Sequence, residues 1–331
     1  MQRKLQAQHD RFALSRPFRI SRGVKTAADV ISVTLRDGDA VGRGEGVPYP
    51  RYGESVESAL AAIEAIRPAI ERGAGRAELL TLLPAGAARN AVDCALWDLE
   101  ARLSGTDVAA MIGAPGADSI ISALTIGIDT PAAMAEAAAL VADAPLLKVK
   151  VDAVDPVGQI RAVRAAAPQS ALIVDPNESW DQTLVEGMQP VLVELRVALL
   201  EQPVPAGADD WLEGFAPAVP ICADESFHVA ADLGVIARRY GAVNVKLDKT
   251  GGLTAALAIA RAARAAGLGL MTGCMVSTSL SIAPALHLAA MSDFVDLDGP
   301  LWLVDDRVGG VRNERGMLTP PTAGFWGTVG R

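Results

Sequence analysis

The spacing of apolar residues changes along the chain, and each pattern predicts a different kind of element. From 28 to 47, β-branched residues alternate with polar ones on both sides of Asp37-Gly38, which predicts a β-hairpin turning at that dipeptide. From Ser55 the apolar residues take helical spacing, and we predict helices over 55–72 and 86–104. The second helix stops before Gly105, a common helix terminator. The first third of the chain is therefore expected to be α+β.

The rest of the chain alternates short apolar runs with alanine-rich helical stretches. Eight runs follow from about Ile120, namely SALTIGI, LLKVKV, ALIVD, VALLE, PICAD, AVNVKL, LGLMTG and DFVDLD. One helix is expected between each pair of strands, which favours a (β/α)7β-type modified TIM barrel over an open, doubly wound sheet, the structural alternative. We expect an α+β capping domain at 1–115, joined by part of the tail 301–331, and the barrel at 116–300.

Composition and charge exclude several function classes. The 331 residues are 50% hydrophobic and 21% charged, as in folded globular chains. A net charge of −9 and the lack of any basic run argue against nucleic acid or an anionic membrane as partner. Three scattered cysteines without a CxxC pair exclude a disulfide scaffold or zinc ribbon. Without a secretory signal or a membrane-spanning stretch, a cytoplasmic protein is expected; a homo-oligomer stays open.

Acidic residues end three successive apolar runs. In a barrel, the carboxyl ends of the strands are where the active site lies. Asp175, Glu201 and Asp224 close ALIVD, VALLE and PICAD. Any one of them is explained more simply as the N-cap of the next helix, but three on neighbouring strands are harder to explain in that way. Carboxylates so close together repel one another unless a cation lies between them. An all-oxygen trio suits a hard cation such as Mg²⁺, whereas zinc prefers histidine or cysteine.

Lysines occupy the neighbouring strands. Lys148 and Lys150 are two residues apart in LLKVKV and therefore share one face, and Lys246 ends AVNVK four strands further around. Buried lysines beside a dication and each other are expected to have a lowered pKa, which suits a general base near neutrality. A lysine on each side of a bound carboxylic acid can remove a proton from one face and return it to the other. For one of the pair, snorkelling from the strand end is the alternative.

Other motifs are weaker by themselves. Asp296 and Asp298 form a DxD pattern that suits an ordinary turn, or an ammonium receiver at a barrel mouth. Arg22 lies in the expected cap, where a guanidinium fork suits a substrate carboxylate. The glycines of GRGEG (42–46) follow a hairpin without a helix behind them, which argues against a dinucleotide site. The start of a helix is sufficient to explain TGG (250–252).

The order KVK, then Asp, Glu and Asp on the next three strands, then Lys, resembles the muconate-lactonising subgroup of the enolase superfamily. Six segments are similar to its dipeptide epimerases of the L-Ala-D/L-Glu type: PYPRYGES, LPAGAARNAVDCALWDL, LEQPVP, ADES, NVKLDKTGGL and DLDGPLWL. The similarity covers the chain except its last residues. Pro176 departs from the pattern, because it removes an N–H donor beside the first acid.

The resemblance implies a role for each residue singled out above. It makes Asp175, Glu201 and Asp224 the Mg²⁺ ligands, Lys150 and Lys246 the acid/base lysines, Lys148 the group that polarises the substrate carboxylate, Asp296 and Asp298 the ammonium receivers, Arg22 the clamp on the glutamate side chain, and Thr125 a further substrate contact. The implied reaction is epimerisation of the C-terminal residue of L-Ala-D-Glu or L-Ala-L-Glu, by two-lysine 1,1-proton transfer through an enediolate, in murein-peptide recycling.

Other activities share this catalytic set. Racemisation of N-acyl amino acids, o-succinylbenzoate synthesis and cycloisomerisation use the same lysines and metal ligands, so these residues alone do not define the substrate. The DxD pair favours a dipeptide with a free amino group. A barrel that binds a dipeptide without turnover is the remote alternative from a different class.

Overall fold

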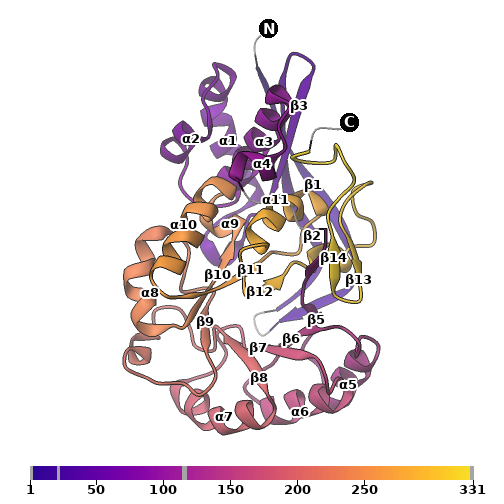
Figure 1. Ribbon diagram of the computed structural model, residues 1–331, viewed down its shortest axis with the longest axis vertical. Coiled ribbons are helices and arrows are strands. Elements are labelled where there is room, and N and C mark those ends of the chain that lie inside the picture. Colours follow the sequence, from indigo (N-terminus) through magenta and orange to yellow (C-terminus); the bar gives the residue numbers. More distant parts are fainter. Residues whose placement is uncertain (1–2, 21–22, 114–117, 329–331) are drawn as a thin grey trace.

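The computed structural model describes residues 3–20, 23–113 and 118–328, arranged as an N-terminal sheet with its helices, a barrel and a small third sheet (Figure 1). The N-terminal sheet is antiparallel in the order β1 (Lys4–Ile20), β2 (Gly23–Asp37) and β3 (Ala40–Gly46). The predicted hairpin is confirmed as β2 and β3. Strand β1 was not predicted, because its alternating residues are mostly polar and at least partly exposed.

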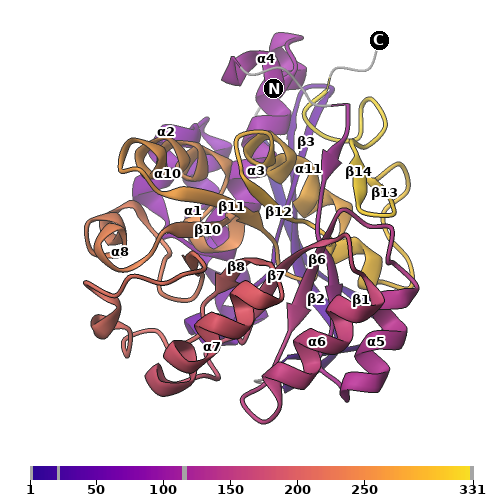
Figure 2. The ribbon, with the colours of Figure 1, turned by 60° about the horizontal axis from the view of Figure 1, so that its bottom comes forward.

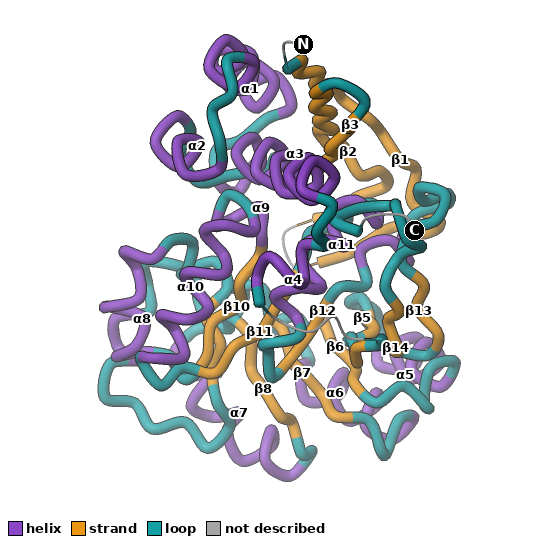
Figure 3. Tube along the Cα trace, turned by 45° about the horizontal axis from the view of Figure 1, so that its top comes forward, coloured by secondary structure: helices purple, strands orange, loops and turns teal. Residues whose placement is uncertain are grey.

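Helices α1 (Val56–Glu71) and α3 (Ala87–Ser104) confirm the two predicted helices, and the short α2 (Arg76–Leu82) and α4 (Val108–Ile112) were not foreseen. Helix α3 lies directly on β2 and β3 (Figure 3). The alternating glycines of GRGEG make this possible: a Cβ at Gly42, Gly44 or Gly46 would lie 2.1–2.2 Å from a backbone oxygen of α3. The motif therefore serves close helix-to-strand packing.

All eight apolar runs form strands of one parallel sheet. In chain order they are β5 (Leu124–Ile126), β6 (Leu146–Lys150), β7 (Ala171–Asp175), β8 (Val197–Glu201), β9 (Ile221–Ala223), β10 (Ala242–Lys246), β11 (Gly269–Gly273) and β12 (Phe294–Asp296). The backbone N–H of Ala123, beside β5, donates to the carbonyl oxygen of Val295 on β12 at 2.8 Å. This bond joins the two ends of the sheet, which makes it a barrel and excludes the open-sheet alternative (Figure 2).

Helices cover the outside of the barrel, but not in the predicted one-per-connection pattern. They are α5 (Pro131–Ala139), α6 (Pro156–Ala166), α7 (Gln182–Glu194), α8 (Leu233–Arg239), α9 (Leu247–Thr250), α10 (Leu253–Ala265) and α11 (Ser279–Ala289). The prediction is wrong between β8 and β9, where only a 3₁₀ turn, Asp210–Leu212, forms. That connection contains four prolines, which lack the N–H that a helix interior requires. The connection from β10 to β11 instead has two helices, α9 and α10.

The third sheet and the C-terminal tail join the barrel to the N-terminal sheet. The third sheet pairs β13 (Arg312–Glu314), β14 (Met317–Thr319) and β4 (Ile120–Ile121). Further along the tail, Trp326 Nε1 donates to the carbonyl oxygen of Arg43 on β3 at 2.9 Å. This contact supports our proposal that part of 301–331 belongs with a capping domain at 1–115, beside a barrel at 116–300.

A buried ion network fastens the same junction. Glu45 on β3 is fully buried and accepts hydrogen bonds from Arg307 Nη2 at 2.8 Å and from the Thr278 N–H at 2.9 Å. Arg307 also donates to Ser32 at 2.6 Å and to Asp10 at 3.1 Å. Burial raises the pKa of Glu45, and the charge of Arg307 opposes that rise. Residues from β1, β2, β3, the start of α11 and the tail therefore meet at one guanidinium.

Candidate active site

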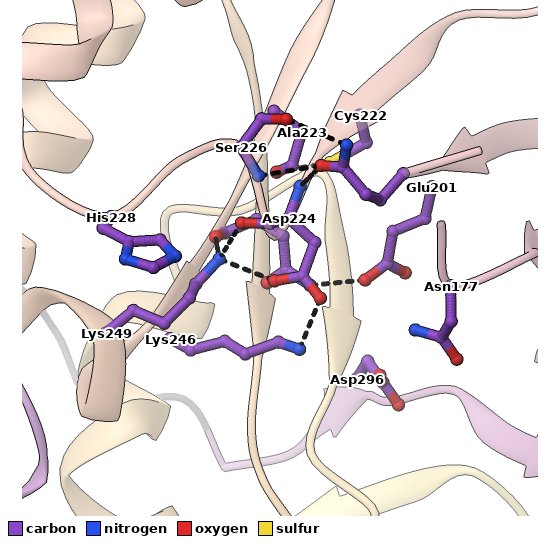
Figure 4. Close-up of polar contacts among 12 residues, drawn as sticks. Asn177, Glu201, Cys222, Ala223, Asp224, Ser226, His228, Lys246, Lys249 and Asp296 are labelled. Atoms are coloured by element: carbon purple, nitrogen blue, oxygen red, sulfur yellow. Dashed lines mark hydrogen bonds and ion pairs between the residues drawn. The ribbon is translucent and has the colours of Figure 1, made fainter. Parts of the chain in front are cut away.

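The strand ends bring most of the predicted site residues to one place at the barrel mouth, and Figure 4 shows Glu201, Asp224, Lys246 and Asp296 among them. They are Lys148 and Lys150 on β6, Asp175 on β7, Glu201 on β8, Asp224 directly after β9, Lys246 on β10, Asp296 on β12 and Asp298 just beyond it, with Thr125 on β5. Each is buried. The N-terminal domain covers this cavity with Phe18, Lys25, Tyr49 and Tyr52. Arg22 lies outside the described residues.

Lys148 lies among the carboxylates. Its Nζ is 2.8 Å from Glu201 Oε2, 2.8 Å from Asp296 Oδ2 and 3.1 Å from Asp175 Oδ2. Burial opposes its charge, but the carboxylates outweigh burial and hold the pKa of Lys148 well above its usual value. The lowered pKa was predicted for a lysine beside a dication; where Lys148 pairs directly with the carboxylates, these ion pairs dominate over burial.

Lys150 pairs with the first acid and with an asparagine that was not predicted. Its Nζ donates to Asp175 Oδ2 at 2.5 Å and to Asn177 Oδ1 at 2.9 Å. The Asn177 N–H donates to Asp175 Oδ1 at 2.8 Å, so a backbone donor reaches this acid despite Pro176. Asn177 has a φ of 46°, a conformation that asparagine tolerates better than most residues. Asn177 could have been identified as a candidate site residue from its position two residues after Asp175, the acid that ends β7.

Lys246 and the unpredicted Lys249 both hold Asp224. Lys246 Nζ lies 2.7 Å from Asp224 Oδ2, and Lys249 Nζ lies 2.6 Å from Oδ1 (Figure 4). Lys249 Nζ also donates to the carbonyl oxygens of Asp224 at 2.6 Å and Asn244 at 3.0 Å. Burial opposes ionisation of Asp224, but the two lysines hold its pKa well below the usual value. Burial opposes the charge of Lys246 as well, but the ion pair with Asp224 outweighs burial and raises the pKa of Lys246.

Glu201 has the least compensated charge of the three acids. Its Oε1 accepts a hydrogen bond from Asn244 Nδ2 at 2.8 Å, and its Oε2 lies 2.8 Å from Lys148 Nζ, an ammonium that it shares with Asp175 and Asp296. Burial and the neighbouring Asp175 carboxylate raise the pKa of Glu201 to about 7. Three buried carboxylates from neighbouring strands are a suitable donor set for a hard cation. Among residues 3–20, 23–113 and 118–328, no three acids, histidines or cysteines are placed so that they could hold a metal ion, and these three acids pair with lysines instead.

The DxD pair lies beside the lysines, on the β5 side. Asp298 Oδ2 accepts the Thr125 N–H at 2.8 Å, and Asp296 Oδ1 is buried without a hydrogen-bond donor. Burial and the adjacent Asp296 carboxylate raise the pKa of Asp298 to about 6. The pair therefore combines negative charge with an oxygen that no donor satisfies, an arrangement that suits a cationic group.

Two family models match the chain. Residues 2–113 match the mandelate racemase / muconate lactonizing enzyme N-terminal domain, and residues 132–325 match the enolase C-terminal domain-like model. The L-Ala-D/L-Glu epimerase of Escherichia coli is 49% identical over 295 residues, which cover 88% of this chain and 92% of that protein. The N-acetyl-D-glutamate racemase of a Pseudoalteromonas species is 44% identical over 300 residues, covering 90% and 95%.

Solved structures agree in fold over nearly the full length. An Agrobacterium tumefaciens enolase family member with homology to dipeptide epimerases, with bound sodium and L-Ala-L-Glu, superposes with a TM-score of 0.95 at 47% identity, covering 98% of this chain and all of that one. A dipeptide epimerase from Methylococcus capsulatus, complexed with Mg and L-Arg-D-Lys, gives a TM-score of 0.88 at 34% identity, covering 97% and 98%.

Proposed function

This chain belongs to the mandelate racemase / muconate lactonizing enzyme family of the enolase superfamily, and we propose that it epimerises the C-terminal residue of L-Ala-D-Glu and L-Ala-L-Glu. The observation that carries the proposal is the pair of buried lysines, Lys150 on β6 and Lys246 on β10, each bound to a different acid of one trio. They approach the cavity from separate strands, as proton transfer between two faces of one carbon requires.

The acid trio supplies the metal ligands in this proposal. Asp175, Glu201 and Asp224 would hold Mg²⁺, for which their buried carboxylate oxygens are suited. When bound, Mg²⁺ neutralises negative charge that develops on the substrate carboxylate and weakens the pull of the three acids on the lysine protons. The Mg-bound relative from Methylococcus capsulatus supports this choice of cation.

The other steps of the proposed reaction are assigned to side chains of the site. Lys150 Nζ takes the α-proton from one diastereomer and Lys246 Nζ returns a proton to the opposite face; the other diastereomer uses them in reverse order. Lys148, held among the carboxylates, places a fixed ammonium beside the substrate carboxylate and polarises it. The covering residues Phe18, Tyr49 and Tyr52 exclude water from this step. Thr125 and Arg22 are proposed as further substrate contacts.

Asp296 and Asp298 receive the free ammonium of the N-terminal residue in this proposal. One observation favours a second candidate: the similarity to an N-acetyl-D-glutamate racemase extends over 90% of the chain. An N-acetyl group carries no charge for the DxD pair to bind, so the structure favours the dipeptide. We also propose a cytoplasmic location and a role in reusing murein peptides, as the resemblance implies.

Proton NMR in D₂O tests the function directly. The protein with Mg²⁺ is incubated separately with L-Ala-L-Glu, L-Ala-D-Glu and N-acetyl-glutamate. We expect loss of the C-terminal α-proton signal and growth of the second diastereomer for both dipeptides. Racemisation of N-acetyl-glutamate with no change in the dipeptides would establish the second candidate instead. Binding without any exchange would reduce the chain to a dipeptide-binding barrel.

The ammonium assignment predicts a pH dependence of KM. Because the pKa of Asp298 is raised to about 6, its carboxyl is ionised above that pH and becomes protonated below it. A protonated carboxyl no longer pairs with the ammonium, so the KM for L-Ala-L-Glu should rise as the pH falls below 6, approaching about tenfold per pH unit. Initial rates between pH 5 and about 8 measure this.

Asp298→Asn is the matched control, since it retains the shape and removes the titrating group. Its KM should be high throughout and lack the rise below pH 6. A wild-type KM that does not change with pH, or that changes equally in Asp298→Asn, would reject Asp298 as an ammonium receiver.

A further inference from the structure

We propose that the N-terminal domain positions Lys246, and not Lys150, through a buried hydrogen-bonded group formed by Asn90, Asp248 and the Val47 N–H, here called the Asn90–Asp248 clamp. Asn90 and Asp248 are positioning residues, because they act on the substrate through Lys246. The inference rests on the proposed function, in which each lysine serves one face of the α-carbon. Its consequence is that damage to the clamp slows proton transfer on one face only.

The clamp lies two residues beyond Lys246. Strand β10 ends at Lys246, and α9 begins with the next residue. Asp248 on α9 is buried, and its Oδ1 accepts the Val47 N–H at 2.8 Å and Asn90 Nδ2 at 2.8 Å. Asn90 Nδ2 also donates to the carbonyl oxygen of Glu45 at 3.1 Å. One carboxylate of α9 is thus fixed both to α3 and to the segment at the end of β3.

Neighbouring residues of α3 hold the end of α9 and the start of α10. Arg89 donates to the carbonyl oxygens of Thr250 at 2.6 Å and Gly251 at 3.1 Å. Asp93 accepts the Thr254 N–H at 2.9 Å and the Thr254 hydroxyl at 2.6 Å. These bonds satisfy backbone groups that helix ends otherwise leave without partners. Helix α3 therefore binds the whole turn that follows Lys246.

The TGG motif allows this contact. Gly251 and Gly252 have φ of 75° and 110°, and an added Cβ would lie 2.4 Å from Arg89 Nε at the first and 2.5 Å from Asp93 Cβ at the second. Both conditions favour glycine. The predicted explanation of the TGG motif, the start of a helix, is therefore incomplete. The two glycines also allow the close approach of α3.

The barrel side of α9 is equally fixed, so a displacement of α9 is transmitted to the site. Lys249, one residue after Asp248, is bound through Nζ to Asp224 and to the Asn244 carbonyl oxygen of β10. The segment from 246 to 249 is therefore held between α3 on one side and the acid that pairs with Lys246 on the other. A shift at Asp248 reaches Lys246 through the single residue between them, Leu247, and through the contact of Lys249 with Asp224.

Lys150 is held differently. Its Nζ is bound by Asp175 and Asn177, both of which belong to β7 and the loop after it. The N-terminal domain reaches this side through the bidentate ion pair of Arg51 with Glu178, whose side chains are 39% and 7% exposed. Glu178 belongs to the loop after β7, a different segment from the strand that carries Lys150. Among the described residues, the domain is thus attached to the segment that itself carries the lysine only on the Lys246 side.

Exchange of the α-proton in D₂O separates the two faces. In Lys246→Ala we expect exchange to persist for the diastereomer whose proton faces Lys150 and to stop for the other, with Lys150→Ala giving the opposite pattern. Asn90→Ala and Asp248→Ala should reproduce the Lys246→Ala pattern in weaker form. Because a misplacement of about 1 Å can cost about 100-fold, we expect about 10- to 100-fold slower exchange for the diastereomer that depends on Lys246, and less than about threefold for the other.

Asp98→Ala is the matched control. Asp98 is also buried on α3, but it accepts the N–H groups of Arg43 at 2.9 Å and Gly327 at 2.8 Å, away from α9. It should leave the ratio of the two exchange rates unchanged. Asp248→Asn, which keeps Oδ1 as an acceptor, should restore that ratio. If the alanine variants do not fold, Asn90→Ser replaces them, because its side chain is too short to span to Asp248.

The outcomes distinguish the inference from the function beneath it. The positioning role would be overturned if the folded clamp variants slowed α-proton exchange equally for both diastereomers. It would also be overturned if Asp98→Ala changed the ratio of the two exchange rates as much as the clamp variants do. Either result would leave the two-lysine proposal intact. If wild-type protein exchanges neither diastereomer, the proposed function itself fails.

Discussion

Epimerisation of L-Ala-L-Glu is expected to stop when either Lys150 or Lys246 is replaced by alanine. In either direction of the reaction, one lysine accepts the α-proton and the other donates a proton to the opposite face. Without one of the two lysines, the configuration of the α-carbon can no longer be inverted. General acid–base groups contribute about 10²–10⁴-fold, and we expect turnover to fall by at least that factor in each variant. Chiral chromatography of the products, at a fixed Mg²⁺ concentration, measures the loss.

The exposed lysine of β1 provides the comparison for these variants. Lys4→Ala also replaces a lysine by alanine, at an exposed position far in sequence from β6 and β10. This variant should retain wild-type turnover. Near-normal epimerisation in Lys150→Ala or Lys246→Ala would mean that one lysine, or another base, suffices for both faces. The two-lysine proposal would then be wrong, whatever substrate the enzyme uses.

Chelation of divalent cations should abolish both epimerisation and α-proton exchange, and added Mg²⁺ should restore them. The same cation should stabilise the folded protein, because it binds three buried acids that repel one another without it. At a free Mg²⁺ concentration about 100 times its dissociation constant, the free energy of unfolding should increase by about 2.7 kcal/mol. A thermal melt with and without Mg²⁺ measures this stabilisation independently of catalysis.

Glu201→Gln tests whether the acids are the ligands. It removes one of the three negative charges while retaining an oxygen, so we expect Mg²⁺ affinity to fall by at least about tenfold. Asp129→Asn, at an exposed acid, should melt as the wild type does in both conditions. If Mg²⁺ raises the melting temperature of Glu201→Gln as much as that of the wild type, the cation binds elsewhere.

The barrel could be predicted because its signals are local. Every strand is an apolar run, and most end in an ionisable residue, so both the strands and the residues at their ends are visible in the sequence. Strand β1 lacked this signal, because Leu5 is the one fully buried residue among its 17 and its other apolar residues are interspersed with polar ones. The helix predicted between β8 and β9 was extrapolated from the other connections of the barrel. The prolines of that segment disfavour a helix, and only a 3₁₀ turn forms there.

The parts of the site that escaped prediction depend on contacts that are distant in sequence. Lys249 lies on a helix of one turn, too short to produce periodicity, and only the fold brings it to Asp224. Asn90 and Asp248 are 158 residues apart, and nothing in either segment indicates that they meet. The ion pairs that raise the pKa of Lys148 depend on the fold in the same way, since the carboxylates that pair with Lys148 come from three other strands.

The network around Arg307 has a consequence for the newly made chain. Glu45 and Arg307 are separated by 262 residues, which a ribosome translating about 5–20 residues per second adds in roughly 13–50 s. Throughout that interval the Glu45 carboxylate lacks its guanidinium partner and must stay hydrated or take up a proton. The N-terminal sheet therefore cannot reach its final packing during synthesis until the whole barrel, and Arg307 beyond it, have been made.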